Sequence, residues 1–167
     1  MEQHKPILTA ADIDRILHRM AFQILEKQPD EESPIYLIGI QKNGVLIAER
    51  LFDLIQSIRP HSKINKGSIQ IDKVNPRNPV ECSIPLAAME ESIIIVIDDV
   101  LNTGSTLMYA IRHFLDIPVR QLKAAVLVNR SHKTFPVKAE IKGISLSTSM
   151  NEHVEVEVHQ QIGVYLR

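Results

Sequence analysis

The stretch SIIIVIDDVLNTGST, residues 92–106, decides the fold of this chain. Residues 93–97 are all β-branched, and a short unbroken apolar run of this kind is typical of a strand buried on both faces of a sheet. We expect the strand to end at the acidic pair Asp98 and Asp99, where it should meet water. A turn rich in small, hydroxyl-bearing residues follows at 102–106.

A helix is expected directly after this turn, because Leu107, Ala110, Ile111 and Phe114 recur at helical spacing. Exposed N–H groups and the helix dipole make a helix N-terminus an anion site. Two carboxylates beside it can hold sugar hydroxyls or a divalent cation, so the pattern predicts a site for a phosphorylated sugar. The alternative is a strand that ends in Asp-Asp before a helix capped by Ser or Thr.

Length and composition favour one domain. The chain has 167 residues, 44% of them hydrophobic, which suits a single well-cored domain over residues 1–167. A net charge of −1 argues against a protein that coats nucleic acid. The single cysteine, Cys82, excludes an internal disulfide and fits a reducing compartment. Without a signal-peptide core or an apolar run of membrane-spanning length, we expect a soluble cytoplasmic protein with no membrane partner.

Strands alternate with helices along the rest of the chain. Apolar periodicity predicts a helix that Thr9 caps and that ends at Gln28, a second helix from Gly44 to Ile55, and strands near 35–40, 67–72, 122–128, 137–141 and 154–158. Pro60–Asn65 reads as a turn and 73–79 as a loop. This alternation indicates an α/β domain with a mainly parallel sheet, in which ligands bind at the carboxyl ends of the strands.

The acidic pair and its turn resemble the phosphoribosyl-pyrophosphate (PRPP) motif of type I phosphoribosyltransferases, an apolar strand followed by D-D-V-x-x-T-G-x-T. The resemblance implies that PRPP is bound by Asp98, Asp99, Val100, Leu101, Asn102, Thr103, Gly104, Ser105 and Thr106. Asp98 and Asp99 would hold the ribose hydroxyls, directly or through water bound to Mg²⁺, and would be the catalytic carboxylates. Asp99 would lie nearest the reaction centre.

Two further loops complete the implied site. Gln41, Lys42, Asn43 and Gly44 follow the first strand and look like the pyrophosphate loop of type I enzymes, with Lys42 as the available cation. An ordinary βα turn is the alternative for this segment. The nucleobase would lie against the loop after the 122–128 strand, near Val128, Asn129 and Arg130.

Nearly the whole chain resembles one branch of this superfamily, the bifunctional pyrimidine-operon attenuation regulators with uracil phosphoribosyltransferase activity. Segments 8–27, 37–51 and 124–140 carry the likeness, and the R-x-H-x-x-x-P pattern at 130–136 points to the branch. The resemblance implies the type I phosphoribosyltransferase fold, a mainly parallel sheet flanked by helices, with transfer of ribose 5-phosphate from PRPP to a uracil-like base. It also implies a homodimer or a larger homo-oligomer.

Several positions depart from the family pattern. Asn43 and Ser105 stand where the family usually carries arginine, and Asn129 stands where it carries aspartate. The flexible loop that closes over the reacting centre is reduced within 67–86, where Lys73 and Arg77 remain as basic residues. Because lids exclude water and complete a catalytic site, an alternative is a regulator that senses PRPP or nucleotides with little or no catalysis.

Binding of a messenger RNA hairpin, as in the resembling regulators, is possible but not favoured. Arg19, His132, Lys133 and Lys138 keep basic or imidazole character at the aligned positions. His18 and Phe22 differ from the family's residues, so contacts to bases and phosphates should be weakened.

A run near the C-terminus offers an alternative metal patch. His153, Glu155, Glu157 and His159 share one face of the expected 154–158 strand. A solvent-facing strand surface explains this alternation without a metal, and we prefer that interpretation.

Overall fold

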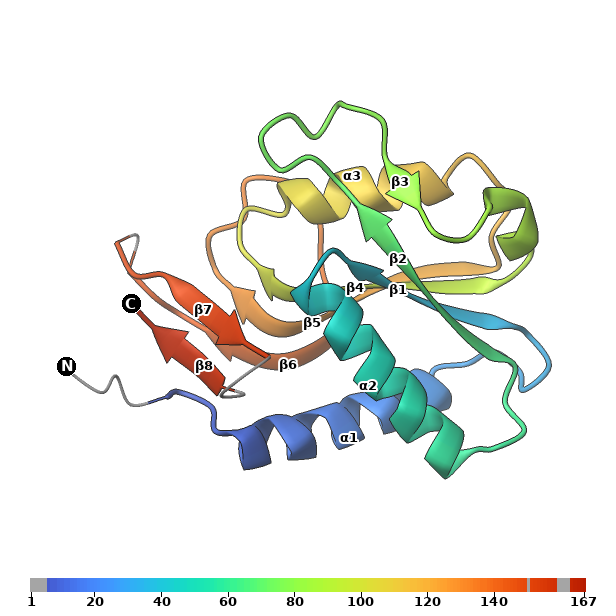
Figure 1. Ribbon diagram of the computed structural model, residues 1–167, viewed down its shortest axis with the longest axis horizontal. Helices are drawn as coiled ribbons and strands as arrows, with labels where there is room; N and C mark the ends of the chain where they lie inside the picture. Colours follow the sequence, from blue (N-terminus) through green and yellow to red (C-terminus); the bar gives the residue numbers. More distant parts are fainter. Residues whose placement is uncertain (1–5, 150, 159–162) are drawn as a thin grey trace.

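A six-stranded sheet forms the centre of the computed structural model, which describes residues 6–149, 151–158 and 163–167 (Figure 1). The strands lie in the order β3-β2-β1-β4-β5-β6. All neighbouring pairs are parallel except β2 and β3, which are antiparallel. The strand bounds are β1 (Ile35–Ile40), β2 (Ile64–Gln70), β3 (Glu81–Cys82), β4 (Ile93–Leu101), β5 (Gln121–Arg130) and β6 (Ile141–Leu146). The predicted α/β fold with a mainly parallel sheet is confirmed.

Three α-helices cover the two faces of this sheet. Helices α1 (Ala10–Glu26) and α2 (Asn43–Ile58) lie on one face, and α3 (Ser105–Phe114) lies on the other (Figure 1). A short 3₁₀ turn, η1 (Leu86–Met89), precedes β4. None of these helices, nor any other in the described ranges, combines the length and apolar character needed to cross a membrane.

The core has two halves because successive side chains of a strand point to opposite faces. Ile93, Ile95 and Ile97 of β4 pack with the apolar faces of α1 and α2. Ile94 and Val96 pack with α3 on the other side. This double burial is the reason that the sequence of β4 is a continuous apolar run rather than an alternating one.

Local signals set the start of the first helix as expected. The Thr9 hydroxyl accepts a hydrogen bond from the N–H of Asp12, and the Asp12 carboxylate accepts one from the N–H of Thr9, which together form a capping box. The second and third helices also confirm the predictions to within a few residues.

Three predictions about strands were wrong. β4 does not end at Asp98 but continues to Leu101, because its pairing with β5 extends that far. β2 begins at Ile64, inside the expected turn, and the strand expected at 137–141 lies instead at Ile141–Leu146. β8 (Gly163–Leu166) was not expected at all.

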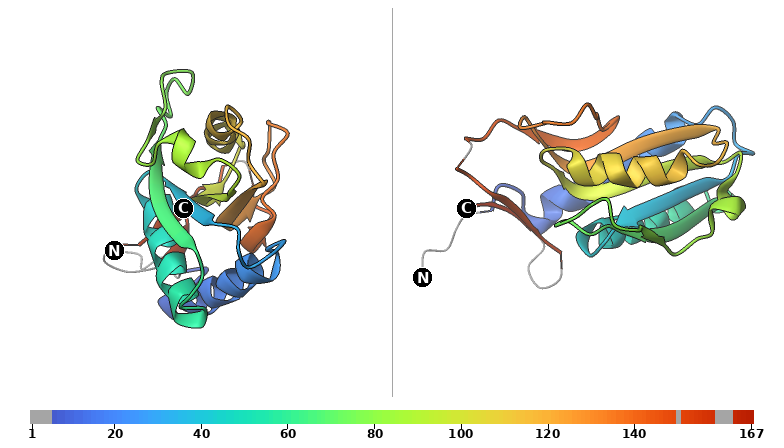
Figure 2. Two further views of the ribbon diagram at one scale, coloured as in Figure 1. Left: turned by 90° about the vertical axis from the view of Figure 1, so that its right-hand side faces the viewer. Right: turned by 90° about the horizontal axis from the view of Figure 1, so that it is seen from above.

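A two-stranded antiparallel unit, which we call the hood, stands beyond the carboxyl ends of β4 and β5 (Figures 1 and 2). It consists of β7 (Val154–Glu157) and β8. Leu8 forms a bridge with Val164 and joins the start of the chain to the hood.

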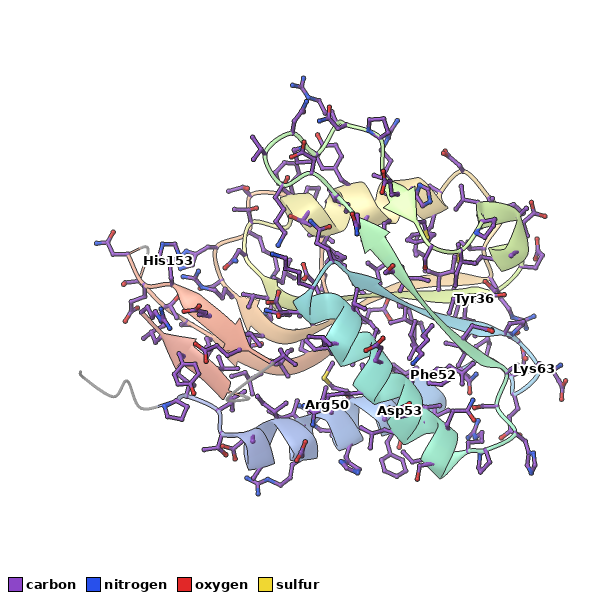
Figure 3. The ribbon with its side chains drawn as sticks, in the orientation of Figure 1. Tyr36, Arg50, Phe52, Asp53, Lys63 and His153 are labelled. Carbon is purple, nitrogen blue, oxygen red and sulfur yellow. The ribbon has the colours of Figure 1, made fainter. Side chains whose placement is uncertain are left out.

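Side-chain contacts at the surface fasten the helices and loops around the sheet. Arg50 of α2, labelled in Figure 3, forms an ion pair with Asp14 of α1. The Tyr36 hydroxyl on β1 donates to the carbonyl oxygen of Ala88 at 2.9 Å, which anchors η1. These contacts lie away from the carboxyl edge of the sheet, where the candidate site is found.

Replacing Gly39 by alanine should destabilise the protein, because α2 begins very close to β1. A Cβ at Gly39 would lie 2.5 Å from the carbonyl oxygen of Gly44, which is backbone and cannot rotate away. We expect the free energy of unfolding in urea to fall by about 1–3 kcal/mol. The control is Gly67→Ala on neighbouring β2, where a Cβ would meet only the side chains of Ile84 and Ser83. Equal losses for the two variants would contradict this account.

Candidate active site

The loops that follow β1 and β4 lie side by side at the carboxyl edge of the sheet. β1 pairs with β2 on one side and with β4 on the other, and the chain order reverses between β1 and β4. Such a switch point leaves a crevice in which ligands of open α/β sheets bind. Here the crevice contains a pocket of about 310 Å³. Its lining residues are Lys73, Asp98, Asp99, Val100, Leu101, Asn102, Thr103, Gly104, Thr106, Leu107 and Val154.

Eight of the nine residues expected to bind PRPP therefore share this pocket, and Ser105 is the exception. Sequence reasoning missed Leu107 and Val154. Val154 comes from the hood, about fifty residues along the chain, and a valine in a short strand carries no signal that it faces a pocket. The assignment of these residues to PRPP stays a prediction.

The acidic pair differs in burial. Asp98 is only 7% exposed, whereas Asp99 is partly exposed. Burial, and then the neighbouring Asp99 charge, raise the pKa of Asp98 well above its usual range, and Lys73 opposes this weakly. The backbone N–H of Asp99 donates to Asp98 Oδ1 at 2.9 Å. The expectation that Asp98 meets water is wrong, because β4 continues past it.

The turn before α3 is shaped to present backbone N–H groups. Gly104 has φ +89°, in the left-handed region, and a Cβ there would collide with Val137. The backbone N–H groups of Thr134 and Phe135 donate to the carbonyl oxygen of Thr103 at 2.9 and 3.0 Å. The first N–H groups of α3 have no acceptor within the helix, so the turn can bind an anion.

The loop after β1 reaches the crevice from the other side. Lys42 precedes α2 with φ +57°, an unusual conformation for a residue with a side chain. Gln41 and Lys42 line a separate, more open hollow with Ser68 and Gln70. Asn43 lines neither, and its side-chain amide donates to Asp99 Oδ2 at 2.8 Å. Gly44 is buried against the end of β4. Their role toward pyrophosphate stays a prediction.

The three residues expected near the nucleobase lie within β5, not in the loop after it. Val128 is fully buried in the core. Asn129 donates to the Ser145 hydroxyl at 3.2 Å, and its side-chain oxygen is buried without a partner in the described residues. Arg130 is 6% exposed. None of the three lines the pocket, so contact with a base stays a prediction that their side-chain positions do not favour.

Arg130 connects the turn before α3 to the segment that precedes β7. Its guanidinium donates to Asn102 Oδ1 at 2.8 Å, to the Thr148 hydroxyl at 2.6 and 3.0 Å, and to the carbonyl oxygen of Glu152 at 2.8 Å. Within the described ranges no carboxylate lies within ion-pair distance of it. A buried guanidinium thus stands directly behind the turn that would hold a phosphate.

The reduced loop between β2 and β3 is organised by one carboxylate. Asp72 accepts hydrogen bonds from the N–H groups of Val74 and Asn75 and from the Asn78 side chain, which lower its pKa. Lys73 lines the pocket beside the acidic pair.

Two of the side chains at the positions aligned with RNA binding form hydrogen bonds within the protein. Arg19 donates to the carbonyl oxygens of Lys142 and Gly143 at 3.1 and 2.5 Å. His132 Nε2 lies 2.8 Å from the carbonyl oxygen of Thr148. These contacts agree with the expectation that RNA binding is not favoured, but they do not test it.

The alternative metal patch finds no support among the residues whose placement is described. Glu155 and Glu157 pair with Arg167 at 2.6 and 3.3 Å, and His153 stands at the edge of β7 (Figure 3). His159 lies outside the described residues. No group of three or more His, Cys, Asp or Glu side chains suited to a metal occurs in the described part of the chain.

The model of the phosphoribosyl transferase domain family matches residues 5–161. The chain belongs to this family. Among curated relatives, the bifunctional protein PyrR of Streptomyces coelicolor is 32% identical over 97% of this chain and 87% of the relative. The PyrR of Pediococcus pentosaceus is 31% identical over 93% of each protein. These relatives confirm the resemblance to bifunctional pyrimidine regulators that the sequence motifs indicated.

Solved structures show the same fold. A hypoxanthine phosphoribosyltransferase of Trypanosoma cruzi superimposes with a TM-score of 0.78 at 15% identity, covering 97% of this chain and 95% of that protein. One from Staphylococcus aureus has a TM-score of 0.75 at 18% identity, covering 96% and 90%. The predicted type I phosphoribosyltransferase fold is therefore confirmed.

Asp98→Asn should stabilise the protein at neutral pH when no cation or ligand is bound. Since the folded-state pKa of Asp98 is raised, the folded state binds its proton more tightly than the unfolded state. Stability must then fall as the pH rises from about 4, the unfolded value, through the folded pKa. Between pH 4 and pH 8, the Tm of Asp98→Asn should therefore decrease less than the Tm of the wild-type protein. A wild-type protein that becomes more stable over the same range than Asp98→Asn would contradict this.

Arg130→Lys should be destabilising although the charge is kept. A single ammonium cannot reach Asn102, Thr148 and Glu152 together, so some of the hydrogen bonds that the buried guanidinium makes are lost. We expect a loss of about 2 kcal/mol in the free energy of unfolding in urea. Arg112→Lys, the same change at an exposed position of α3, should stay within about 0.5 kcal/mol of wild type.

Proposed function

We propose that this phosphoribosyltransferase transfers the ribose 5-phosphate of PRPP to a uracil-like base and releases pyrophosphate. One observation carries the proposal. An acidic pair and a helix N-terminal turn line one pocket at the switch point of the sheet. A phosphorylated sugar needs acceptors for its hydroxyls and N–H donors for its phosphate, and this pocket offers both at adjacent positions. We take residues 1–167 to act as one domain.

The two loops, the turn before α3 and residues 41–44, are predicted to bind different groups of PRPP. The 5-phosphate lies at the turn, bound by the N–H groups at the start of α3 and by the hydroxyls of Thr103, Ser105 and Thr106. The ribose hydroxyls lie against Asp98 and Asp99. The diphosphate lies toward residues 41–44, where backbone N–H groups at the start of α2 and the Lys42 ammonium offset its charge.

The acidic pair also suits Mg²⁺. Carboxylate oxygens are the ligands this cation prefers, and a bound cation would offset the burial and the Asp99 charge that raise the pKa of Asp98. Asp98 and Asp99 would hold the metal, mostly through water and PRPP. When bound, Mg²⁺ would neutralise charge on the diphosphate.

The reaction that this arrangement serves is displacement at C1 of the ribose. A ring nitrogen of the base forms a bond to C1, the bond from C1 to the diphosphate oxygen breaks, and the ring nitrogen loses its proton to solvent or base. Positive charge develops on the ribose ring in the transition state. Asp99, on the open side of the pair, would stabilise this charge, while the Gln41–Gly44 loop would stabilise the leaving diphosphate.

A sensor of PRPP or nucleotides with little catalysis is the second candidate. The loop between β2 and β3 favours it, since that loop is short, is folded around Asp72 and contributes only Lys73 to the pocket lining. By resemblance we also expect a cytoplasmic homodimer or larger homo-oligomer. RNA binding stays possible and not favoured.

Calorimetric titration with PRPP, with and without Mg²⁺, followed by a screen of nucleobases for pyrophosphate release, tests the proposal. Binding with release on addition of uracil supports the transferase. Binding without release for any base supports the sensor. If PRPP does not bind, both candidates are wrong.

Thr103→Val should weaken every ligand that carries a 5-phosphate. The substitution removes a hydroxyl next to the N–H groups of the turn and keeps the shape of the side chain. We expect KM for PRPP and Kd for uridine monophosphate to rise about tenfold, as for loss of one hydrogen bond to a charged group. Thr134→Val, on the exposed loop that supports the turn through its backbone, is the control. Unchanged affinities in Thr103→Val would show that the phosphate binds elsewhere.

A further inference from the structure

The side chain of Asn43 connects three elements at the edge of the pocket. Its amide nitrogen lies 2.8 Å from Asp99 Oδ2 at the end of β4 and 2.9 Å from the carbonyl oxygen of Val156 in β7. Both partners only accept hydrogen bonds, so the nitrogen, not the oxygen, of the amide must face them. The two N–H groups of Asn43 are thereby both used.

These contacts hold the Asp99 carboxylate from two sides. Oδ2 accepts from Asn43, and Oδ1 accepts from the backbone N–H of Val100 at 2.8 Å. A carboxylate with one donor on each oxygen cannot rotate freely, while its remaining lone pairs stay open to the pocket that Asp99 lines. The amide is neutral, so it orients Asp99 without cancelling the negative charge that a cation or an electron-poor ribose requires.

The same amide also fastens the hood. Asn43 holds the carbonyl oxygen of Val156, and Arg130 holds that of Glu152 four residues earlier. Val154 lies midway between these two points and lines the pocket. The pocket wall at β7 is therefore held by one side chain from the start of α2 and one from the end of β5, which donate to backbone carbonyl oxygens in β7 and just before it.

We infer that Asn43 is a positioning residue: it orients Asp99 toward the ribose and holds β7 at the pocket wall. This inference rests on the proposed function and revises the expected role of Asn43 within the pyrophosphate loop. Since both side-chain donors are engaged, the diphosphate must be met by backbone N–H groups and Lys42. A neutral residue at position 43 therefore fits its contacts with Asp99 and Val156, although the resembling family usually carries an arginine there.

Two substitutions at Asn43 separate positioning from ligand binding. Asn43→Ala removes the donors, and Asn43→Asp keeps the shape but places a second carboxylate against Asp99. We expect kcat to fall about 10- to 100-fold in Asn43→Ala, as for a misplaced catalytic group, and further in Asn43→Asp. KM for PRPP should change less than threefold in Asn43→Ala, and the Mg²⁺ concentration for half-maximal rate should rise several-fold. Asn65→Ala, at an exposed position of β2, is the control and should match wild type.

A large rise in KM for PRPP with unchanged kcat would overturn the inference, because it would make Asn43 a ligand of the diphosphate. Unchanged kinetics would overturn it as well.

A double-mutant cycle keeps the inference testable without turnover. Asn43→Ala, Asp99→Ala and the double variant are unfolded in urea without substrates. Contacting residues should deviate from additivity by at least about threefold in the unfolding equilibrium constant. Additive effects would overturn the inference. If the wild-type protein releases no pyrophosphate, the proposed function is wrong, and the cycle alone then decides whether Asn43 holds Asp99.

Discussion

Burial of the Asp98 carboxylate at the end of the central strand is the constraint on which the site depends. The residue lies in β4 opposite Val126 of the parallel neighbour β5, is only 7% exposed, and is followed directly by a second carboxylate. Such a charge is costly in the ligand-free protein, which the raised pKa of Asp98 expresses. Buried carboxylates with a raised pKa are a common feature of functional sites.

Polar side chains from α2 and β5, rather than apolar ones, connect the elements around Asp98. Asn43 from the start of α2 reaches the hood at Val156, and Arg130 from the end of β5 reaches Glu152, just before the hood. Arg130 also donates to Asn102, so one buried guanidinium connects the turn before α3 to the segment that precedes the hood. The sheet, the turn and the hood form one connected polar frame around the pocket. Because buried polar networks tolerate loss of a member poorly, the geometry of the site is coupled to the stability of this edge.

Particular residues show why some of the site was predictable from sequence. The apolar run 93–97, the acidic pair and the T-G turn are contiguous, so their order along the chain already places them on a strand end and a helix start. Thr9 and Asp12 likewise interact within one turn of helix. The extension of β4 to Leu101 was not predictable in this way, because Val100 and Leu101 are held in the sheet by Val128 and Asn129 of β5. Pairing with β5 therefore extends β4 past the acidic pair, which in the sequence alone indicates the end of a strand.

The sequence by itself determined the α/β class, the family and the pocket residues that lie within residues 98–106, because strand, turn and helix signals act over a few neighbouring residues. Only the tertiary structure decided that Val154 lines this pocket, that Asn43 faces Asp99 and that the buried Arg130 donates to Asn102. These relations join residues 28 to 113 positions apart, such as Asn43 and Val156, through hydrogen bonds that form only when sheet, helix and hood are packed together. Local propensity does not encode such pairings, since they depend on which strands become neighbours.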